Sequence, residues 1–329
     1  MATAQDSAPT TEPARGVGYA ARTMIGRIGI VIPFAITFVV LTLISPPFTR
    51  FENLANILDQ QSGIVIAAAA ATFVLIAGGI DLSIGAVYGL AGAMAAQLVP
   101  SIGVPGAIAA GLALGLGVGA VNGILVTRFR INALIGTLAM TYVVGGIGAI
   151  LTKGNLVVAF DHPEYQHFAA TPIFGVTSAA WMMIGLAVVA AIVLSRTTFG
   201  RYVYATGGNA TAARLGGVRI DAIRLATFVI SGGAAALAGI LDSSRVLSAQ
   251  ASSGSFLTFT VLAGVVVGGT SILGGEGAIW RTVFGCLFIA LVGNGFNLLG
   301  FDPFYQQITL GAILLFAVGV DAWSRRLGQ

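Results

Sequence analysis

The chain has 329 residues, of which 57% are hydrophobic and only 9% are charged, and its formal net charge is +4. A soluble domain carries about 25% charged residues, so 16 basic and 12 acidic side chains cannot cover a soluble fold of this length. The 46 glycines follow no G-X-Y period, which excludes collagen, and the apolar content excludes disorder. The composition predicts an all-α polytopic membrane protein without a soluble catalytic domain and without catalytic residues.

Hydropathy divides this chain into about ten transmembrane helices. A span needs about 20 mostly apolar residues to cross a hydrocarbon core of about 30 Å. Spans two and three are separated only by Gly78-Gly79, so nine spans is the alternative. The predicted spans are residues 28–45, 62–78, 83–99, 105–127, 131–151, 178–195, 223–242, 255–272, 278–299 and 304–322.

The first span follows a polar N-terminal tail. Residues 1–27 contain Pro9 and Pro13 and have no cleavable apolar core of their own, unlike a signal peptide. We therefore expect a disordered cytoplasmic tail, an uncleaved first span and one membrane domain over residues 28–326.

Span two ends in a glycine-rich break that carries an acidic residue. The segment reads T-F-V-L-I-A-G-G-I-D-L-S-I-G from Thr72 to Gly85. An acidic group at the bilayer centre costs about 2.5–3.5 kcal/mol on insertion scales, so Asp81 requires an explanation. Two interpretations stay open: the carboxylate caps a helix N-terminus, or it contacts a partner or has a conformational role.

Span four carries glycine at every fourth position, at Gly111, Gly115, Gly119 and Gly123. Such a ridge of small residues predicts close packing against another helix. The nearby G-x-G pattern lies inside an apolar span and is not a nucleotide fingerprint, and no G-x-x-x-x-G-K-[ST] sequence occurs. The chain therefore has no P-loop, and any ATP would be bound by another subunit.

Two loops carry polar side chains that could meet ligands or partners. The outer loop holds Asp161, His162, Glu164 and His167, but their spacing does not match a metal site, so we expect a solvated cap or a docking surface and no metal. The longest inner loop is residues 195–224. There Asn209 is placed to cap a short helix over residues 210–215, which docks into a soluble partner or lies at the lipid headgroups.

A second broken segment reads V-L-A-G-V-V-V-G-G-T-S-I-L-G-G-E-G from Val261 to Gly277. Like the first, it has a β-branched run, a Gly-Gly pair, one acidic residue and further glycine. Paired glycine interruptions mark internal repeats and transport pathways in membrane transporters. The sequence therefore indicates a possible internal repeat with two Gly-broken hairpins, and Glu276 has the same two interpretations as Asp81.

Polar residues inside otherwise apolar spans are candidates for a transport pathway. Intramembrane amides and hydroxyls serve equally as interhelical hydrogen bonds, worth about 0.6–2 kcal/mol, so both interpretations stay open for each residue. The candidates are Asn122, Thr137, Thr141, Tyr142, Asn294 and Asn297.

The basic residues predict the orientation. With an inside N-terminus and ten spans, only Arg50, Lys153 and Arg245 lie outside, and the remaining 13 of the 16 basic residues lie in cytoplasmic segments. The positive-inside rule therefore places both termini in the cytoplasm. No Lys/Arg cluster is interleaved with aromatic residues, so no nucleic-acid partner is expected. The cytoplasmic residues are Arg15, Arg22, Arg27, Arg128, Arg130, Arg196, Arg201, Arg214, Arg219, Arg224, Arg281, Arg325 and Arg326.

Three motifs in this order resemble a known family. They are G-G-I-D-L-S-I-G (78–85), G-R-Y-V-Y-A-T-G-G-N-A-T-A-A-R-L-G-G-V (200–218) and V-V-V-G-G-T-S-I-L-G-G-E-G (265–277). Together they resemble the permease subunits of bacterial ABC sugar importers of the ribose/xylose/galactose class, over nearly the whole chain. The resemblance implies a type II ABC importer-like permease in the bacterial plasma (inner) membrane, which takes up a monosaccharide or polyol by alternating access.

The resemblance also implies partners: a cytoplasmic ABC ATPase that binds ATP and Mg, a periplasmic or lipid-anchored sugar-binding protein, and a second permease copy in a homodimer. No cofactor would be bound by this chain itself. The stretch from Asn209 to Gly217 would be the coupling helix on the ATPase. Its named positions are Asn209, Ala212, Ala213, Arg214, Leu215, Gly216 and Gly217, and the positions of the broken hairpins are Gly78, Gly79, Asp81, Gly268, Gly269, Gly274, Gly275 and Glu276.

One departure from the family concerns the second motif. Family members usually carry acidic residues just before it, where this chain has Thr258 and Thr260. This departure puts ribose as the substrate in doubt. For the assembly, a paired second permease is the alternative to a homodimer. Two other classes of protein are alternatives: an ion-coupled secondary transporter of a small polar solute, and an exporter or channel.

Overall fold

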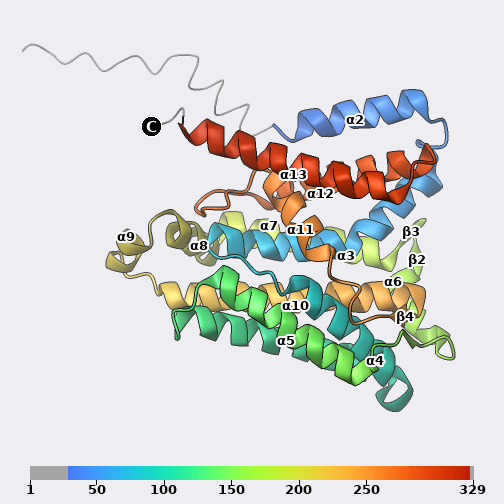
Figure 1. The fold of residues 1–329 in the computed structure, drawn as a ribbon, viewed down its shortest axis with the longest axis horizontal. Coiled ribbons are helices and arrows are strands. Elements are labelled where there is room, and N and C mark those ends of the chain that lie inside the picture. Colours follow the sequence, from blue (N-terminus) through green and yellow to red (C-terminus); the bar gives the residue numbers. More distant parts are fainter. Residues whose placement is uncertain (1–28, 327–329) are drawn as a thin grey trace, which may run out of the picture.

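Long helices aligned along one axis make up the computed structural model (Figure 1). It describes residues 29–326, with side chains through residue 319, so the predicted tail 1–27 lies outside the described residues. Within that range the chain is mostly helical, which confirms the predicted class. The helices are α2 (Val31–Ile44), α3 (Phe51–Ile76), α4 (Ile84–Thr127), α5 (Ala133–Thr152), α6 (His167–Ala170), α7 (Ser178–Arg196), α8 (Thr198–Gly208), α9 (Ala210–Leu215), α10 (Ile220–Val246), α11 (Leu257–Val267), α12 (Ile279–Leu298) and α13 (Pro303–Arg326).

Short irregular elements cover one end of the bundle. Strand β1 (Val157–Val158) pairs antiparallel with β4 (Ser248–Ala249), and β2 (Pro172–Ile173) pairs with β3 (Val176–Thr177). A 3₁₀-helix, η1 (Pro163–Gln166), precedes α6. The strands lie at the opposite end of the molecule from α9 (Figure 1).

Six helices are long and apolar enough to cross a membrane: α3, α4, α5, α7, α10 and α12. Three shorter apolar helices are α2, α11 and the Pro303–Gly319 part of α13. Helix α4 is 44 residues long and covers the two predicted spans 83–99 and 105–127. A kink separates the two spans, since Gly103 adopts a non-helical conformation (φ 71°) between Pro100 and Pro105. The number of ten crossings stays a prediction.

Helix α3 begins at Phe51, eleven residues before the predicted start of span two at residue 62. The first turns of this helix are polar. Two of these polar side chains have partners on other helices: Asn53 bonds Asn294 on α12, and Asp59 accepts a hydrogen bond from Thr177 at the start of α7. These partners hold a polar helix segment against the bundle, although most of its residues stay exposed or half-buried.

Two further boundaries differ from the prediction. Span 255–272 contains only the 11-residue α11, because the chain leaves the helix at Gly268 and stays irregular up to α12. The inner loop 195–224 contains α8 in addition to the predicted short helix, and Thr197 caps α8 with its hydroxyl.

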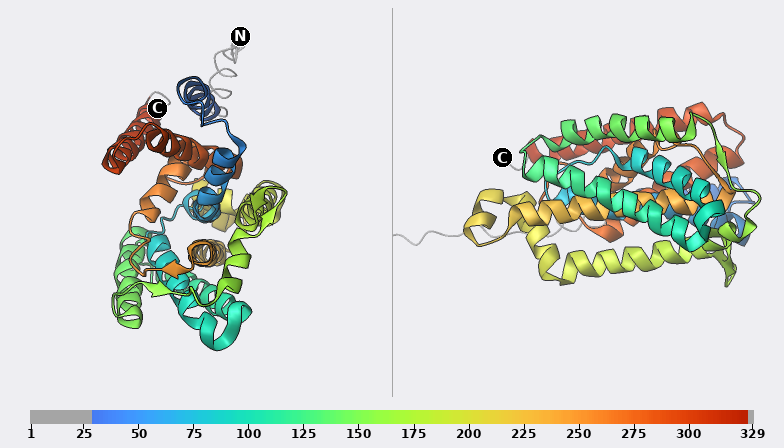
Figure 2. Two further views of the ribbon diagram at one scale, coloured as in Figure 1. Left: turned by 90° about the vertical axis from the view of Figure 1, so that its right-hand side faces the viewer. Right: turned by 90° about the horizontal axis from the view of Figure 1, so that it is seen from below.

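The glycine ridge of α4 packs closely on α10, as predicted. A Cβ on Gly115 would overlap the Gly232 carbonyl, and one on Gly119 would overlap the Phe228 carbonyl. The two backbones therefore touch along these helices, which lie side by side near the centre of the bundle (Figure 2). This contact positions the broken segment that precedes α4.

Candidate functional site

The three sequence motifs meet at one place, where backbone packs directly on backbone. We call this place the glycine junction, and its members are Gly78, Gly207, Gly208, Gly274 and Gly275. The backbone N–H of Gly275 donates to the carbonyl oxygen of Ile76, 2.9 Å away. A Cβ on Gly207 would overlap that same carbonyl and lie 2.7 Å from the Gly275 nitrogen. The junction therefore joins the ends of α3 and α8 to the segment before α12, and it leaves no space for a side chain at Gly207.

A tyrosine of α8 strengthens this junction. The hydroxyl of Tyr204 donates to the carbonyl oxygen of Gly277, 2.8 Å away. Burial raises the pKa of Tyr204, so this hydroxyl keeps its proton and remains a donor at alkaline pH. Helix α8 is thus attached to the second broken segment by a side chain as well as by its terminal glycines.

Helix α9 extends this connection into solvent. The side chain of Asn209 accepts a hydrogen bond from the Ala212 N–H, 2.9 Å away, which is the predicted N-cap. The helix ends at Leu215, and Gly217 follows with φ +83°. Ala213 is buried toward the body, whereas Leu215 is 86% exposed. The short helix projects from one end of the bundle (Figure 1), and its predicted docking role stays a prediction.

Helices α3 and α11 end in the same hydrogen-bonded motif. The Gly79 N–H donates to Val74 O and the Thr270 N–H donates to Val265 O, in each case five residues back. The residue before each donor, Gly78 or Gly269, has φ near +80°. The structural equivalence thus pairs Gly78 with Gly269, one residue away from the pairing of the two Gly-Gly motifs in the sequence.

Asp81 is buried in the irregular segment between α3 and α4. Its Oδ1 accepts hydrogen bonds from the N–H and the hydroxyl of Ser83, and its Oδ2 accepts one from Ser231 on α10 at 2.7 Å. Ser83 in turn accepts from the Asn122 amide. The carboxylate thus accepts a hydrogen bond from a backbone N–H just before α4, although the N-cap residue of α4 is Ser83. Through Ser231, Asp81 also holds α10 against the broken segment.

Three threonines satisfy the irregular backbone beside Asp81. The Leu82 N–H donates to Thr137, the Thr141 hydroxyl donates to Leu82 O at 2.9 Å, and the Gly85 N–H donates to Thr258 at 2.9 Å. Non-helical backbone at membrane depth requires such partners. Thr258, which the resemblance marked as a departure from the expected acidic residue, therefore has a structural contact.

Glu276 differs from Asp81. It is exposed, and α12 begins after Ala278 with no side-chain cap, so the capping interpretation was wrong for Glu276. The remaining interpretation, contact with a partner or a conformational role, stays a prediction.

The six pathway candidates fall into separate groups. Asn122, Thr137 and Thr141 surround the broken segment, and Tyr142 is 76% exposed on α5. Asn294 and Asn297 line a cavity of about 720 Å³ between α3, α11, α12 and α13. The structure therefore does not bring all six residues into one passage.

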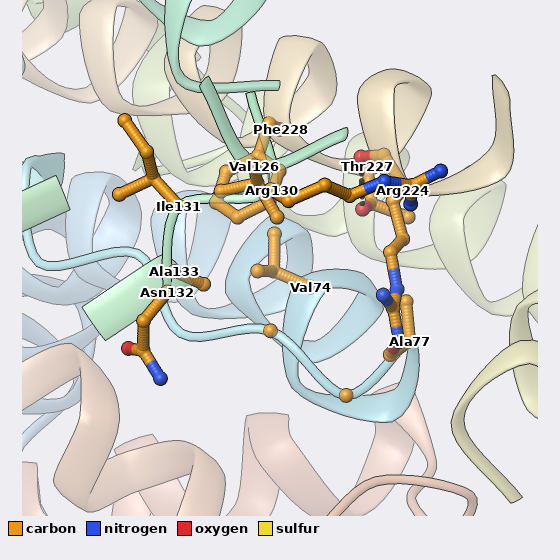
Figure 3. A pocket seen from close by; sticks show the side chains of 12 residues that line it. Val74, Ala77, Val126, Arg130, Ile131, Asn132, Ala133, Arg224, Thr227 and Phe228 are labelled. Carbon is orange, nitrogen blue, oxygen red and sulfur yellow. Dashed lines mark hydrogen bonds between the residues drawn. The ribbon is translucent and has the colours of Figure 1, made fainter. Parts of the chain in front are cut away.

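A smaller cavity, of about 200 Å³, lies beside the first glycine motif (Figure 3). Arg130 and Arg224 extend along one side of it, and Ile131 and Asn132 lie on another. Arg130 forms a two-bond ion pair with Asp221, at 2.9 and 3.1 Å. In the sequence Arg130 and Arg224 bear only on orientation, because nothing in the spacing of Arg130 and Asp221 signals their ion pair.

A charged network at the strand end was also missed. Arg245 contacts Asp242 at 2.8 Å and Asp59 at 3.6 Å, and Asp242 accepts from Tyr88 on α4. The i,i+3 spacing of Asp242 and Arg245 was the available signal. The network joins α3, α4 and α10 near the ends that lie away from α9.

The outer loop forms a pair of polar residues at the same end. His162 Nδ1 lies 2.9 Å from Glu164 Oε1, and this hydrogen bond lowers the pKa of Glu164. Across residues 29–326, no three His, Cys, Asp or Glu side chains gather as metal ligands. The predicted docking role of this loop stays a prediction.

Comparison with known proteins adds a family. The model of the "Branched-chain amino acid transport system / permease component" family matches residues 53–318. The ribose import permease protein RbsC of Escherichia coli K12 is 36% identical over 316 residues, which is 95% of this chain and 98% of that protein. RbsC of Bacillus subtilis is 34% identical over 90% of this chain and 92% of that protein, and the L-arabinose ABC transporter permease protein AraH of Azospirillum brasilense is 34% identical over 92% and 89%. No solved structure matches.

Proposed function

This chain belongs to the branched-chain amino acid transport system / permease component family, and we propose that it is the membrane-spanning permease subunit of an ABC importer for a monosaccharide or related polyol. Two relatives that match nearly the whole chain are a ribose import permease and an L-arabinose ABC transporter permease. The observation that supports this function most directly is the glycine junction, which connects a projecting helix to two broken membrane segments.

In this proposal α9 is the coupling helix. A cytoplasmic ABC ATPase, which holds ATP and Mg, contacts Arg214 and Leu215 on its exposed face. Movement of α9 is passed through α8 to the glycine junction, because the backbone of Gly207 packs directly against the backbone of Ile76 and Gly275. From there it reaches α4 and α12, the helices that follow the two broken segments.

The irregular segments supply the flexibility that alternating access needs. Each follows a helix that ends at a residue with φ near +80°, Gly78 or Gly269, and lacks a regular helical ladder of its own. Asp81, Thr137 and Thr141 hold the first segment in one arrangement through hydrogen bonds that can be exchanged. We infer that they position this hinge, and that the pathway runs elsewhere.

The topology proposed is ten crossings with both termini in the cytoplasm of a bacterial inner membrane. The α9 end then carries the cytoplasmic arginines, including Arg130 and Arg224, in agreement with the positive-inside rule. A second permease copy completes the pore, and a periplasmic or lipid-anchored binding protein delivers the sugar at the strand end.

Reconstitution tests this function. The chain is expressed with a candidate ABC ATPase and a candidate sugar-binding protein, and uptake of ribose, arabinose, xylose and galactose is measured with and without ATP. We expect co-purification of the ATPase and ATP-dependent uptake of at least one of these sugars. Sugar transport by the chain alone, without ATP or partners, would show that the proposal is wrong.

A further inference from the structure

The lining of the larger cavity combines apolar side chains with polar side chains that carry no charge. It measures about 720 Å³ and lies within the range of about 300–1,000 Å³ that is usual for small-molecule sites. Among the described residues that line it there is no Asp, Glu, Lys, Arg or His. Its polar lining consists of Gln60, Gln61, Thr260, Asn294, Asn297, Gln306 and Gln307.

One amide in this lining has an acceptor without a partner. The Oε1 atom of Gln61 is buried and makes no hydrogen bond among the described residues. Buried polar atoms almost always have a partner, and in its present position this oxygen is closed off from the cavity. Gln61 lines the cavity, and rotation about the terminal bond of its side chain would bring an amide group to a ligand there.

A neighbouring amide pair leaves groups that can bind the same ligand. The Gln306 Nε2 donates to Asn297 Oδ1, 2.6 Å away. The Asn297 amide N–H groups and the Gln306 amide oxygen keep hydrogen-bonding capacity. Amides that both donate and accept suit hydroxyl groups, which also do both, and the rings of Phe256 and Phe259 offer apolar faces for C–H groups.

We propose that this cavity is a subsite for a neutral polyhydroxylated solute, held mainly by Gln61, Asn297 and Gln306. This proposal rests on the proposed function and identifies a place where the sugar binds during transport. The α3 residues of the cavity, from Ile57 to Gln61, lie several turns before the glycine junction at Ile76, so the subsite occupies the half of the molecule away from α9. The sugar there sits apart from the coupling elements and meets no fixed charge.

The first test uses chemical protection of a cysteine in the cavity. Gln307→Cys is made in a Cys286→Ser background in the full chain with its ATPase and binding protein, and is labelled with a neutral, water-soluble maleimide. The sugar that the transporter imports should slow this labelling in a saturable way. Asn155→Cys, an exposed residue outside the cavity, should label at the same rate with and without sugar.

The second test uses transport. Gln61→Leu keeps the side-chain size but removes its hydrogen bonds, so uptake at limiting sugar should fall by about two- to tenfold. Gln97→Leu, an exposed amide of α4 outside the cavity, should leave uptake unchanged. Co-purification of the ATPase with each variant verifies that assembly is intact.

Four results would overturn the subsite. In the labelling test, these are that sugar does not slow the labelling of Gln307→Cys although uptake is normal, that Gln307→Cys is not labelled because lipid fills the cavity, or that Gln307→Cys forms a disulfide with a second copy. In the transport test, it is that Gln61→Leu and Gln97→Leu take up sugar equally. Failure of the wild-type transporter to import any sugar is a different result, because it contradicts the proposed function itself.

Discussion

Gly275 donates its backbone N–H to the carbonyl oxygen of Ile76 at 2.9 Å, and Gly207 packs against both groups. The last turn of α3, the end of α8 and the segment before α12 therefore share one contact. Because all three contributors are backbone, no side-chain rearrangement can absorb a displacement of α8. The contact behaves as a rigid joint between the projecting helix pair and the membrane helices.

The joint predicts that substitution by alanine is harmful at Gly207 and harmless at the adjacent Gly208. Gly207→Ala places a Cβ against the Ile76 carbonyl, so we expect a loss of about 1–3 kcal/mol from overpacking and a loss of sugar-stimulated ATPase activity. Gly208→Ala is the matched control, because its Cβ meets nothing within 4 Å. Thermal unfolding in detergent and ATPase assays of the assembled transporter measure both. Equal behaviour of the two variants would contradict the joint.

The buried carboxylate of Asp81 gives a second prediction. Asp81→Ala leaves the Ser83 N–H and the Ser231 hydroxyl without their acceptor, which costs about 1–3 kcal/mol. We expect a lower melting temperature and reduced uptake, since the broken segment loses its attachment to α10. Asp161→Ala, at an exposed position before η1, is the control and should melt within a degree or two of the wild type. A stable Asp81→Ala variant would show that the carboxylate does not position the hinge.

Local features of this fold could be predicted from the sequence, and contacts between distant segments could not. The Asn209 cap and the breaks at Gly78 and Gly268 depend on neighbouring residues, so the pattern indicates them directly. The start of α3 was hidden, because the polarity of Asn53 is compensated by Asn294, far along the chain. The convergence of the three glycine motifs was hidden for the same reason.

The candidate site was predictable to the same extent. Motif resemblance indicated which glycines matter, but not that Gly78, Gly207 and Gly275 touch. The hydroxyl of Thr137 inside an apolar span looks identical whether it faces a pathway or satisfies an irregular backbone. Only the position of Leu82 beside it decides for the second use.

Tyr165 in the outer loop predicts a change at alkaline pH. Its buried hydroxyl contacts Ser243 at 2.5 Å, and burial raises the pKa of Tyr165 to about 12 from 10.0. Because the pKa of Tyr165 is higher in the folded state than in the unfolded state, its neutral hydroxyl contributes its full stabilisation below pH 10.0. This contribution to the stability of the fold is lost as the pH rises to about 12. Melting temperatures at pH 8 to 11 should therefore fall less for Tyr165→Phe than for wild type. Tyr202→Phe, an exposed tyrosine of α8, should follow the wild type.

The docking role of α9 is tested by reversing the charge of Arg214. This residue is exposed in the last turn of a six-residue helix, so Arg214→Glu changes the surface that we propose to face the ATPase while the Asn209 cap stays intact. We expect at least about tenfold weaker retention of the ATPase, which corresponds to about 1.4 kcal/mol, with a matching loss of uptake. Lys153→Glu makes the same charge change at the opposite end and should retain the ATPase. Arg214→Lys keeps the charge and should recover most of the binding. Full ATPase retention and uptake by Arg214→Glu would exclude Arg214 from the contact, and loss in Lys153→Glu alone would place the ATPase at the strand end and reverse the proposed orientation.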